Sequence, residues 1–146
     1  MSELKELAAE AKHELLTHII PFWRGMRDDK FGGYYGYLSY DLALDEKAEK
    51  GCILNSRITW FFANAYLLYK DGGISEEECE AAGFKGEDLL AEAKHGYEFL
   101  REHCIDKEYG GIFWSLNYDG TPLDTTKHTY NQAFCIYCLL YTSPSP

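Results

Sequence analysis

Long hydrophobic runs are missing from this sequence of 146 residues. No apolar stretch approaches the roughly 20 residues that a membrane-spanning helix requires. The first residues, Met1 to Lys5, also lack the apolar core of a secretory signal peptide. We therefore expect a protein that has no membrane partner and that is located in the cytoplasm.

Basic residues are scarce as well. Fourteen Lys and Arg stand against 24 Asp and Glu, and the formal net charge is −10 at pH 7. A protein that binds nucleic acid normally carries a basic surface for the phosphates. The charge balance therefore argues against nucleic acid as a partner and gives no support for an anionic membrane surface.

The familiar cofactor and metal motifs are absent. The sequence holds no P-loop, no G-x-G-x-x-G turn, no zinc quartet and no Ser-His-Asp set. Five cysteines make an odd count, and Cys135 and Cys138 have the spacing of a metal or redox pair. They lie within an apolar run without a second pair, so we interpret them as core residues. No metal and no cofactor are expected.

What the sequence does contain is a repeat. Residues 31–41, FGGYYGYLSYD, match residues 109–119, YGGIFWSLNYD, in an aromatic at the first and fifth positions, the Gly-Gly pair, a Leu at the eighth and the closing Tyr-Asp. Self-similarity at a fixed spacing is typical of folds built from one repeated supersecondary unit. Such units bury their hydrophobic faces against their neighbours.

Hydrophobic periodicity predicts a helix before and after each copy. Residues 3–24 and 88–104 are amphipathic, and Pro21 is expected to kink or end the first of these helices. Residues 53–70 are apolar on nearly every side, which predicts burial on all sides, and a second apolar helix starts near Lys127. A short acidic helix over 75–82 has Ser75 as N-cap and Glu78 in a capping box.

Outer amphipathic helices therefore alternate with inner apolar helices, with a Gly-Gly hairpin between them. This order predicts an all-α fold, an α/α toroid with short β-hairpins between the helices. We expect residues 1–141 to form the N-terminal part of a single domain. Residues 142–146, TSPSP, are interpreted as a non-native or truncated tail. With unpartnered helix faces, 1–146 alone is expected to be inactive and poorly soluble.

Three polar residues near the starts of the inner helices are the candidates for chemistry. Arg57 lies in the most apolar helix, where an unpaired charge requires an acceptor or a wet cavity. Tyr130 occupies the corresponding place in the second inner helix, and Asn55 lies near Arg57. We predict a catalytic role for Arg57 and substrate contacts for Tyr130 and Asn55. The alternatives are an Arg paired to a hairpin carboxylate, and packing or capping for the other two.

Several segments resemble the N-acylglucosamine 2-epimerase family, in its branch that acts on cellobiose. They are HIIPFW at 18–23, RDD at 27–29, GGYYGYLSY at 32–40, SRI at 56–58 and KHTYN at 127–131. The similarity extends from the first helix to about Tyr137. It implies an (α/α)6 barrel of which this chain supplies four helices.

The resemblance also implies a reaction. C2 of the reducing-end glucose of cellobiose, a β-1,4-linked disaccharide, is inverted through ring opening and a cis-enediolate, without metal or nucleotide. Arg57 matches the family's active-site Arg and Tyr130 its cavity-lining Tyr, whereas Asn55 stands where some members carry His. The two histidines that act as acid and base are expected beyond Pro146.

Two other functions stay open. One is the activity of an N-acylglucosamine 2-epimerase or a mannose isomerase of the same family. The other is a non-catalytic α/α repeat module that binds sugar or protein through its aromatic cavity.

Overall fold

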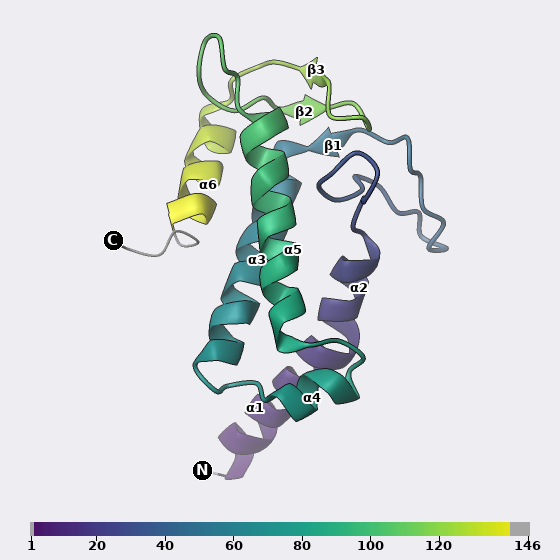
Figure 1. Ribbon diagram of the computed structural model, residues 1–146, viewed down its shortest axis with the longest axis vertical. Coiled ribbons are helices and arrows are strands. Elements are labelled where there is room, and N and C mark those ends of the chain that lie inside the picture. Colours follow the sequence, from purple (N-terminus) through teal and green to yellow (C-terminus); the bar gives the residue numbers. More distant parts are fainter. Residues whose placement is uncertain (1, 141–146) are drawn as a thin grey trace.

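The computed structural model describes residues 2–140, and most of them lie in helices that run along one long axis (Figure 1). The chain travels along this axis and back twice. The helices α2 and α5 end where α3 and α6 begin, and the hairpins and strands gather at that end (Figure 1). The predicted all-α class is confirmed. No helix among the described residues is long and apolar enough to cross a bilayer.

The first long helix is continuous from Ser2 to Gly25 and contains one widened turn. It comprises α1 (Ser2–Glu14), the π-helical segment η1 (Leu15–Ile19) and α2 (Ile20–Gly25). Pro21 lies in the first turn of α2, directly after the widened turn. Because proline has no backbone N–H and its ring crowds the preceding turn, a local π-helical turn lets the helix accommodate it. The helix therefore continues past Pro21 instead of ending there.

The remaining helices lie close to their predicted bounds. They are α3 (Cys52–Lys70), α4 (Glu76–Ala81), α5 (Gly86–Phe99) with the π-helical segment η2 (Leu100–Cys104), and α6 (Thr129–Leu140). The capping box of α4 is confirmed. The Ser75 hydroxyl accepts from the Glu78 N–H at 3.2 Å, and the Glu78 carboxylate accepts from the Ser75 N–H at 2.8 Å.

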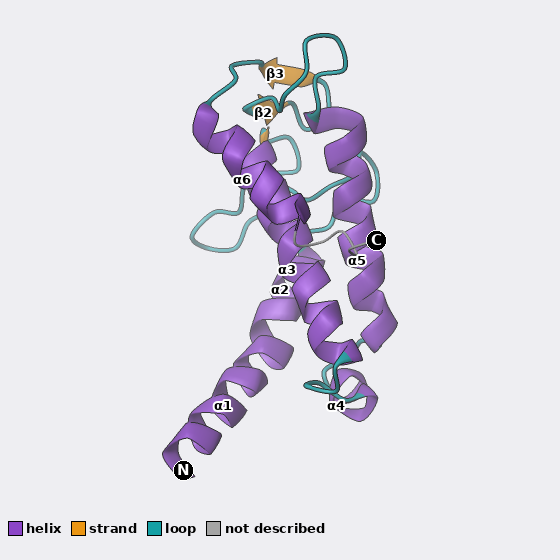
Figure 2. Cartoon of the chain, turned by 90° about the vertical axis from the view of Figure 1, so that its left-hand side faces the viewer, coloured by secondary structure: helices purple, strands orange, loops and turns teal. Residues whose placement is uncertain are grey.

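The inner helix α3 packs against both α5 and α6 (Figure 2). Its third side is open, because Arg57 and Leu67 are exposed and Trp60 and Phe61 are only half-buried. The prediction that this helix is buried on all sides is therefore wrong for the chain as described. Its apolar composition shows that it is suited to a further partner on that side.

A small sheet connects the two helix–hairpin–helix units. The strands β1 (Lys50–Gly51), β2 (Ser115–Leu116) and β3 (Pro122–Asp124) pair antiparallel in that order. Strand β1 leads into α3 of the first unit, whereas β2 and β3 belong to the hairpin of the second. The repeated hairpins are thus joined to each other through backbone hydrogen bonds.

The two hairpins share one geometry that starts from an aspartate. Asp28 and Asp106 each accept hydrogen bonds from the backbone N–H groups of the second and third residues after them, at 2.9 to 3.0 Å. The other carboxylate oxygen binds a lysine at 2.6 Å, Lys50 in the first unit and Lys127 in the second. All four glycines of the Gly-Gly pairs have φ between +66° and +81°. Because side-chain residues rarely adopt this conformation, the glycines recur with the turn.

Apolar side chains form two cores, one between α2, α3 and α5 and one beneath the hairpins. Cys135 and Cys138 are 1% and 2% exposed, and all five cysteines are free and buried, as predicted for core residues. The second core contains three of the cysteines, Cys52, Cys104 and Cys135. Its other buried members are Phe99, Leu100, Ile112, Phe113 and Leu116.

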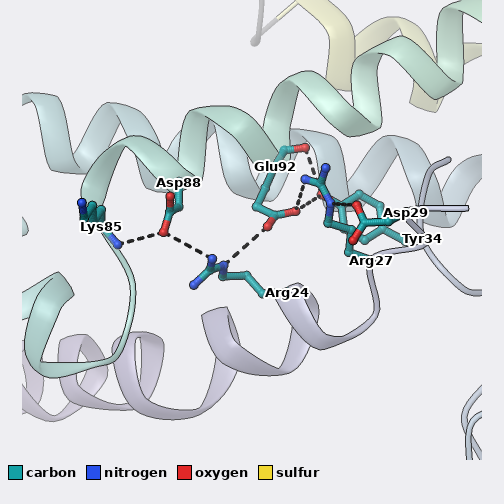
Figure 3. Close-up of polar contacts among 7 residues, drawn as sticks. All are labelled: Arg24, Arg27, Asp29, Tyr34, Lys85, Asp88 and Glu92. Atoms are coloured by element: carbon teal, nitrogen blue, oxygen red, sulfur yellow. Dashed lines mark hydrogen bonds and ion pairs between the residues drawn. The ribbon is translucent and has the colours of Figure 1, made fainter.

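A buried carboxylate connects the two outer helices (Figure 3). Glu92 of α5 is 5% exposed, and its Oε2 accepts from Arg27 Nη1 and from the Tyr34 hydroxyl, both at 3.2 Å. Arg24 of α2 reaches Glu92 at 3.5 Å and Asp88 at 3.3 Å. Burial, and then the nearby Glu92 carboxylate, raise the pKa of Tyr34, so its hydroxyl stays a donor. This network fixes the first hairpin against the second unit.

Candidate active site

Arg57 and Tyr130, which hold corresponding places in the two inner helices, lie together. Arg57 Nη2 donates to the Tyr130 hydroxyl oxygen at 3.1 Å, and the guanidinium carbon lies 4.3 Å from the centroid of the Phe134 ring. Arg57 comes from the second turn of α3, while Tyr130 and Phe134 lie one turn apart on α6. The packing of α6 on α3 therefore brings a cation, a hydroxyl and a ring face to one place.

The charge of Arg57 is not compensated within the described residues. Its side chain is exposed, and no carboxylate of residues 2–140 lies within ion-pairing distance of it. The described residues therefore do not form the alternative arrangement, in which a structural Arg is paired to a hairpin carboxylate. A tyrosine hydroxyl and a ring face orient a guanidinium without neutralising it. Its remaining N–H groups are available to an anion.

An aromatic hollow of about 410 Å³ lies beside this guanidinium. Arg57, Trp60 and Phe61 of α3 line it, together with Phe134 of α6 and Trp23 of α2. The indole N–H of Trp60 is buried and has no hydrogen-bond partner within the described residues. The hollow therefore offers aromatic side chains next to a cation, which is a combination found in small-molecule sites.

Asn55 does not take part in this arrangement. Its side chain is 0% exposed; its Oδ1 accepts from the Tyr34 N–H at 2.9 Å and its Nδ2 donates to the Gly51 carbonyl at 3.1 Å. Gln132 in the second unit accepts from the Ile112 N–H at 2.7 Å in the same way. These contacts are those of a residue that supports the hairpin, and we propose this role for Asn55 in place of a contact with substrate.

The histidines near the hairpins are also engaged. His95 Nε2 lies 2.8 Å from the Gly33 carbonyl oxygen, and His103 Nδ1 lies 3.2 Å from the Gly120 carbonyl oxygen. His128 packs edge-on against Trp114, with ring centroids 4.6 Å apart. Among residues 2–140, no group of three or more His, Cys, Asp or Glu is arranged to hold a metal ion.

The sequence did not predict that Trp60, Phe134 and Trp23 line the same hollow as Arg57. A signal for two of them was present, because Trp60 follows Arg57 by three residues and Phe134 follows Tyr130 by four. At these spacings two side chains lie on the same face of a helix. Trp23 carries no such signal, since it comes from another helix.

Comparisons with known proteins bear on the family of this chain. Residues 33–142 match the family model described as N-acylglucosamine 2-epimerase. The chain is 51% identical over 133 residues to the cellobiose 2-epimerase of Ruminococcus albus, covering 91% of this chain and 30% of that protein. It is 53% identical over 126 residues to the cellobiose 2-epimerase of Eubacterium cellulosolvens, covering 86% and 27%.

Solved structures give the same result. The structure of cellobiose 2-epimerase from Bacillus thermoamylovorans superposes with a TM-score of 0.82 at 38% identity, over 94% of this chain and 32% of that one. The fold is thus confirmed as part of an (α/α)6 barrel. The chain spans less than a third of the length of these relatives. The chain belongs to the N-acylglucosamine 2-epimerase family.

Proposed function

We propose that the chain forms part of a carbohydrate 2-epimerase acting on cellobiose and related β-1,4-linked disaccharides. The observation that carries this proposal is the exposed guanidinium of Arg57, which Tyr130 and Phe134 hold and which no carboxylate of residues 2–140 neutralises. The names of the most similar relatives support the choice of cellobiose as the substrate. The predicted tail at 142–146 lies outside the described residues.

The chemistry requires an anion to be stabilised. After the sugar ring opens, removal of the proton at C2 next to the aldehyde produces a planar cis-enediolate with negative charge on its oxygens. A guanidinium is planar and donates two parallel hydrogen bonds, so Arg57 suits this charge and geometry. A preorganised cation stabilises the developing charge more than it stabilises the neutral sugar, which lowers the barrier.

Tyr130 and the hollow position the substrate and add no charge to the site. The Tyr130 hydroxyl accepts from Arg57 and is left with its own proton to donate to a sugar oxygen. Trp60 and Phe61 present ring faces to the C–H groups of a pyranose. Proton transfer at C2 requires an acid and a base, and His95 and His103 already contact backbone carbonyls. We propose that other parts of the complete gene product supply both groups.

The proposal is tested by incubating the complete gene product that contains this chain with cellobiose in D2O. We expect glucosyl-mannose that carries deuterium at C2, read by NMR. Turnover of N-acetylglucosamine or mannose without turnover of cellobiose would show that the substrate is wrong. Binding of cellobiose without any exchange at C2 would identify a non-catalytic module.

A further inference from the structure

The Gly-Gly pair of the first hairpin is covered by a ring from the second unit. A Cβ atom placed on Gly33 would lie 2.6 Å from a ring carbon of Phe99, and one placed on Gly32 would lie 3.2 Å from the same ring. Phe99 is the last residue of the outer helix α5 and is 3% exposed. The outer helix of one unit thus places an aromatic ring on the hairpin of the unit before it.

The same ring encloses the Asp–Lys pair of that hairpin. Lys50 Nζ lies 5.2 Å from the Phe99 ring centroid, and the side chains of Lys50 and Asp28 are 0% and 1% exposed. One turn before Phe99, His95 Nε2 lies 2.8 Å from the Gly33 carbonyl oxygen. Two residues on one face of α5 therefore close the hairpin by a ring contact and a hydrogen bond.

The second hairpin has the same parts, but among residues 2–140 no ring takes the place of Phe99. A Cβ on Gly111 would meet Gln132 Oε1 at 2.9 Å, as one on Gly33 would meet Asn55 Oδ1 at 2.6 Å, but a Cβ on Gly110 would meet no described atom within 4 Å. The side chains of Lys127 and Asp106 remain 31% and 11% exposed. They line a hollow of about 400 Å³ together with Tyr109, Gly110 and Phe113, among others.

We infer that this hollow accommodates an aromatic side chain from the outer helix of a further unit of the same protein. The helix that fits carries the ring at its C-terminal end and a hydrogen-bond donor one turn earlier, as α5 does. The inference concerns how the units assemble and does not depend on the proposed activity.

The aromatic residue at the tip of each hairpin also indicates that a further unit packs against the second hairpin. Phe31 at the tip of the first hairpin packs edge-on against Tyr118 of the second, with ring centroids 5.4 Å apart. Tyr109 holds the equivalent place on the second hairpin and is 82% exposed. The further unit therefore also places a residue equivalent to Tyr118 against Tyr109. The relatives are long enough to contain such a unit, because the chain covers only 30% of the Ruminococcus albus protein.

A sugar is a poorer occupant than a ring. Three charged residues line the hollow, and two of them, Asp106 and Lys127, are already paired to each other at 2.6 Å; the third is Glu108. In the first unit, the equivalent pair of Asp28 and Lys50 is enclosed beneath the ring of Phe99 and not beneath a polar group. The hollow thus matches a ring that covers an ion pair.

The test is thiol labelling in the complete gene product. Tyr109→Cys and, as an exposed control on the outer helix, Lys94→Cys are each reacted with a maleimide, and the label at each position is read by peptide mass spectrometry; the five cysteines of this chain are buried. We expect Tyr109→Cys to react about tenfold or more slowly than Lys94→Cys, because a further unit covers it. This protection is expected to be the same at all protein concentrations, with or without cellobiose.

Three outcomes overturn the inference. Equal labelling at the two positions would show that the hollow is uncovered. Protection of Tyr109→Cys only with cellobiose would show that the occupant is a sugar. Protection that disappears on dilution would show that the occupant is a second copy of the protein. Acetylation footprinting of the unaltered protein gives an independent measurement if Tyr109→Cys does not fold. Lys127 should then be acetylated as little as Lys50, and labelling of Lys127 equal to that of Lys94 would also overturn the inference.

Discussion

The guanidinium of Arg57 and the hydroxyl of Tyr130 are 3.1 Å apart, although the two residues are separated by 73 positions in the chain. They come from the first two turns of two inner helices that the hairpins bring side by side (Figure 2). The repeat thus does more than double a structural unit. It places one candidate site residue from each unit against the other.

Loss of the Tyr130 hydroxyl should weaken catalysis without abolishing it. Tyr130→Phe removes the acceptor that orients Arg57, and one hydrogen bond contributes about 0.5–1.5 kcal/mol. We expect kcat/KM for cellobiose to fall roughly three- to tenfold. Tyr40→Phe alters a fully exposed tyrosine and serves as the control, with no change expected. An unchanged kcat/KM for Tyr130→Phe would remove the residue from the site.

Asn55 should affect stability rather than substrate binding. In Asn55→Ala the Tyr34 N–H is left buried without its acceptor, which costs about 1–3 kcal/mol of unfolding free energy. Urea unfolding measures this loss, and KM is expected to stay unchanged. Asn64→Ala is the matched control, because among the described residues the Asn64 side chain donates to the Trp60 carbonyl of its own helix and to no other helix or hairpin. A raised KM at unchanged stability would instead favour the contact with substrate that the sequence predicted.

The buried pair of Lys50 and Asp28 should be sensitive to removal of one partner. Lys50→Met leaves the Asp28 carboxylate buried without its cation, which costs about 3–5 kcal/mol. Addition of Asp28→Asn should recover part of this loss in urea unfolding. Lys107→Met removes an exposed partner of Glu102 and should cause no measurable loss. A small effect of Lys50→Met would show that the pair does not hold the hairpin.

The same pair should make stability depend on pH in the acid range. Burial raises the pKa of Asp28, but the hydrogen bonds from Lys50 and from two backbone N–H groups outweigh it and hold the pKa below its ordinary value of 3.8. A carboxyl with a lowered pKa stabilises the fold above its unfolded pKa and loses this contribution as the pH falls through its folded pKa.

The wild-type protein should therefore lose more unfolding free energy between about pH 6 and about pH 3 than Asp28→Asn does. Urea unfolding at both pH values provides the comparison. Equal losses in the two proteins would contradict the contribution of Asp28.

The sequence could predict the helices and the equivalent positions of Arg57 and Tyr130 because both depend on local pattern. Apolar spacing marks the helices, and the repeated hairpin aligns the start of α3 with the start of α6, which made Arg57 and Tyr130 equivalent candidates.

The role of Asn55 could not be predicted in this way. Two residues before Arg57, it lies on another face of the helix, and only packing decides whether that face meets the hairpin or the cavity. The ion pair of Asp28 with Lys50 and the ring contact of Arg57 with Phe134 likewise depend on how distant segments meet.

The central claim is that the charge of Arg57 stabilises an enediolate formed at C2 of cellobiose. The most direct test is the rate of deuterium incorporation at C2 in D2O, compared between the wild-type gene product and Arg57→Met. The substitution keeps an unbranched chain of similar length but removes the cation, so we expect the rate to fall about 10²- to 10³-fold, with the fold intact by circular dichroism. Incorporation at the wild-type rate in Arg57→Met would contradict the claim.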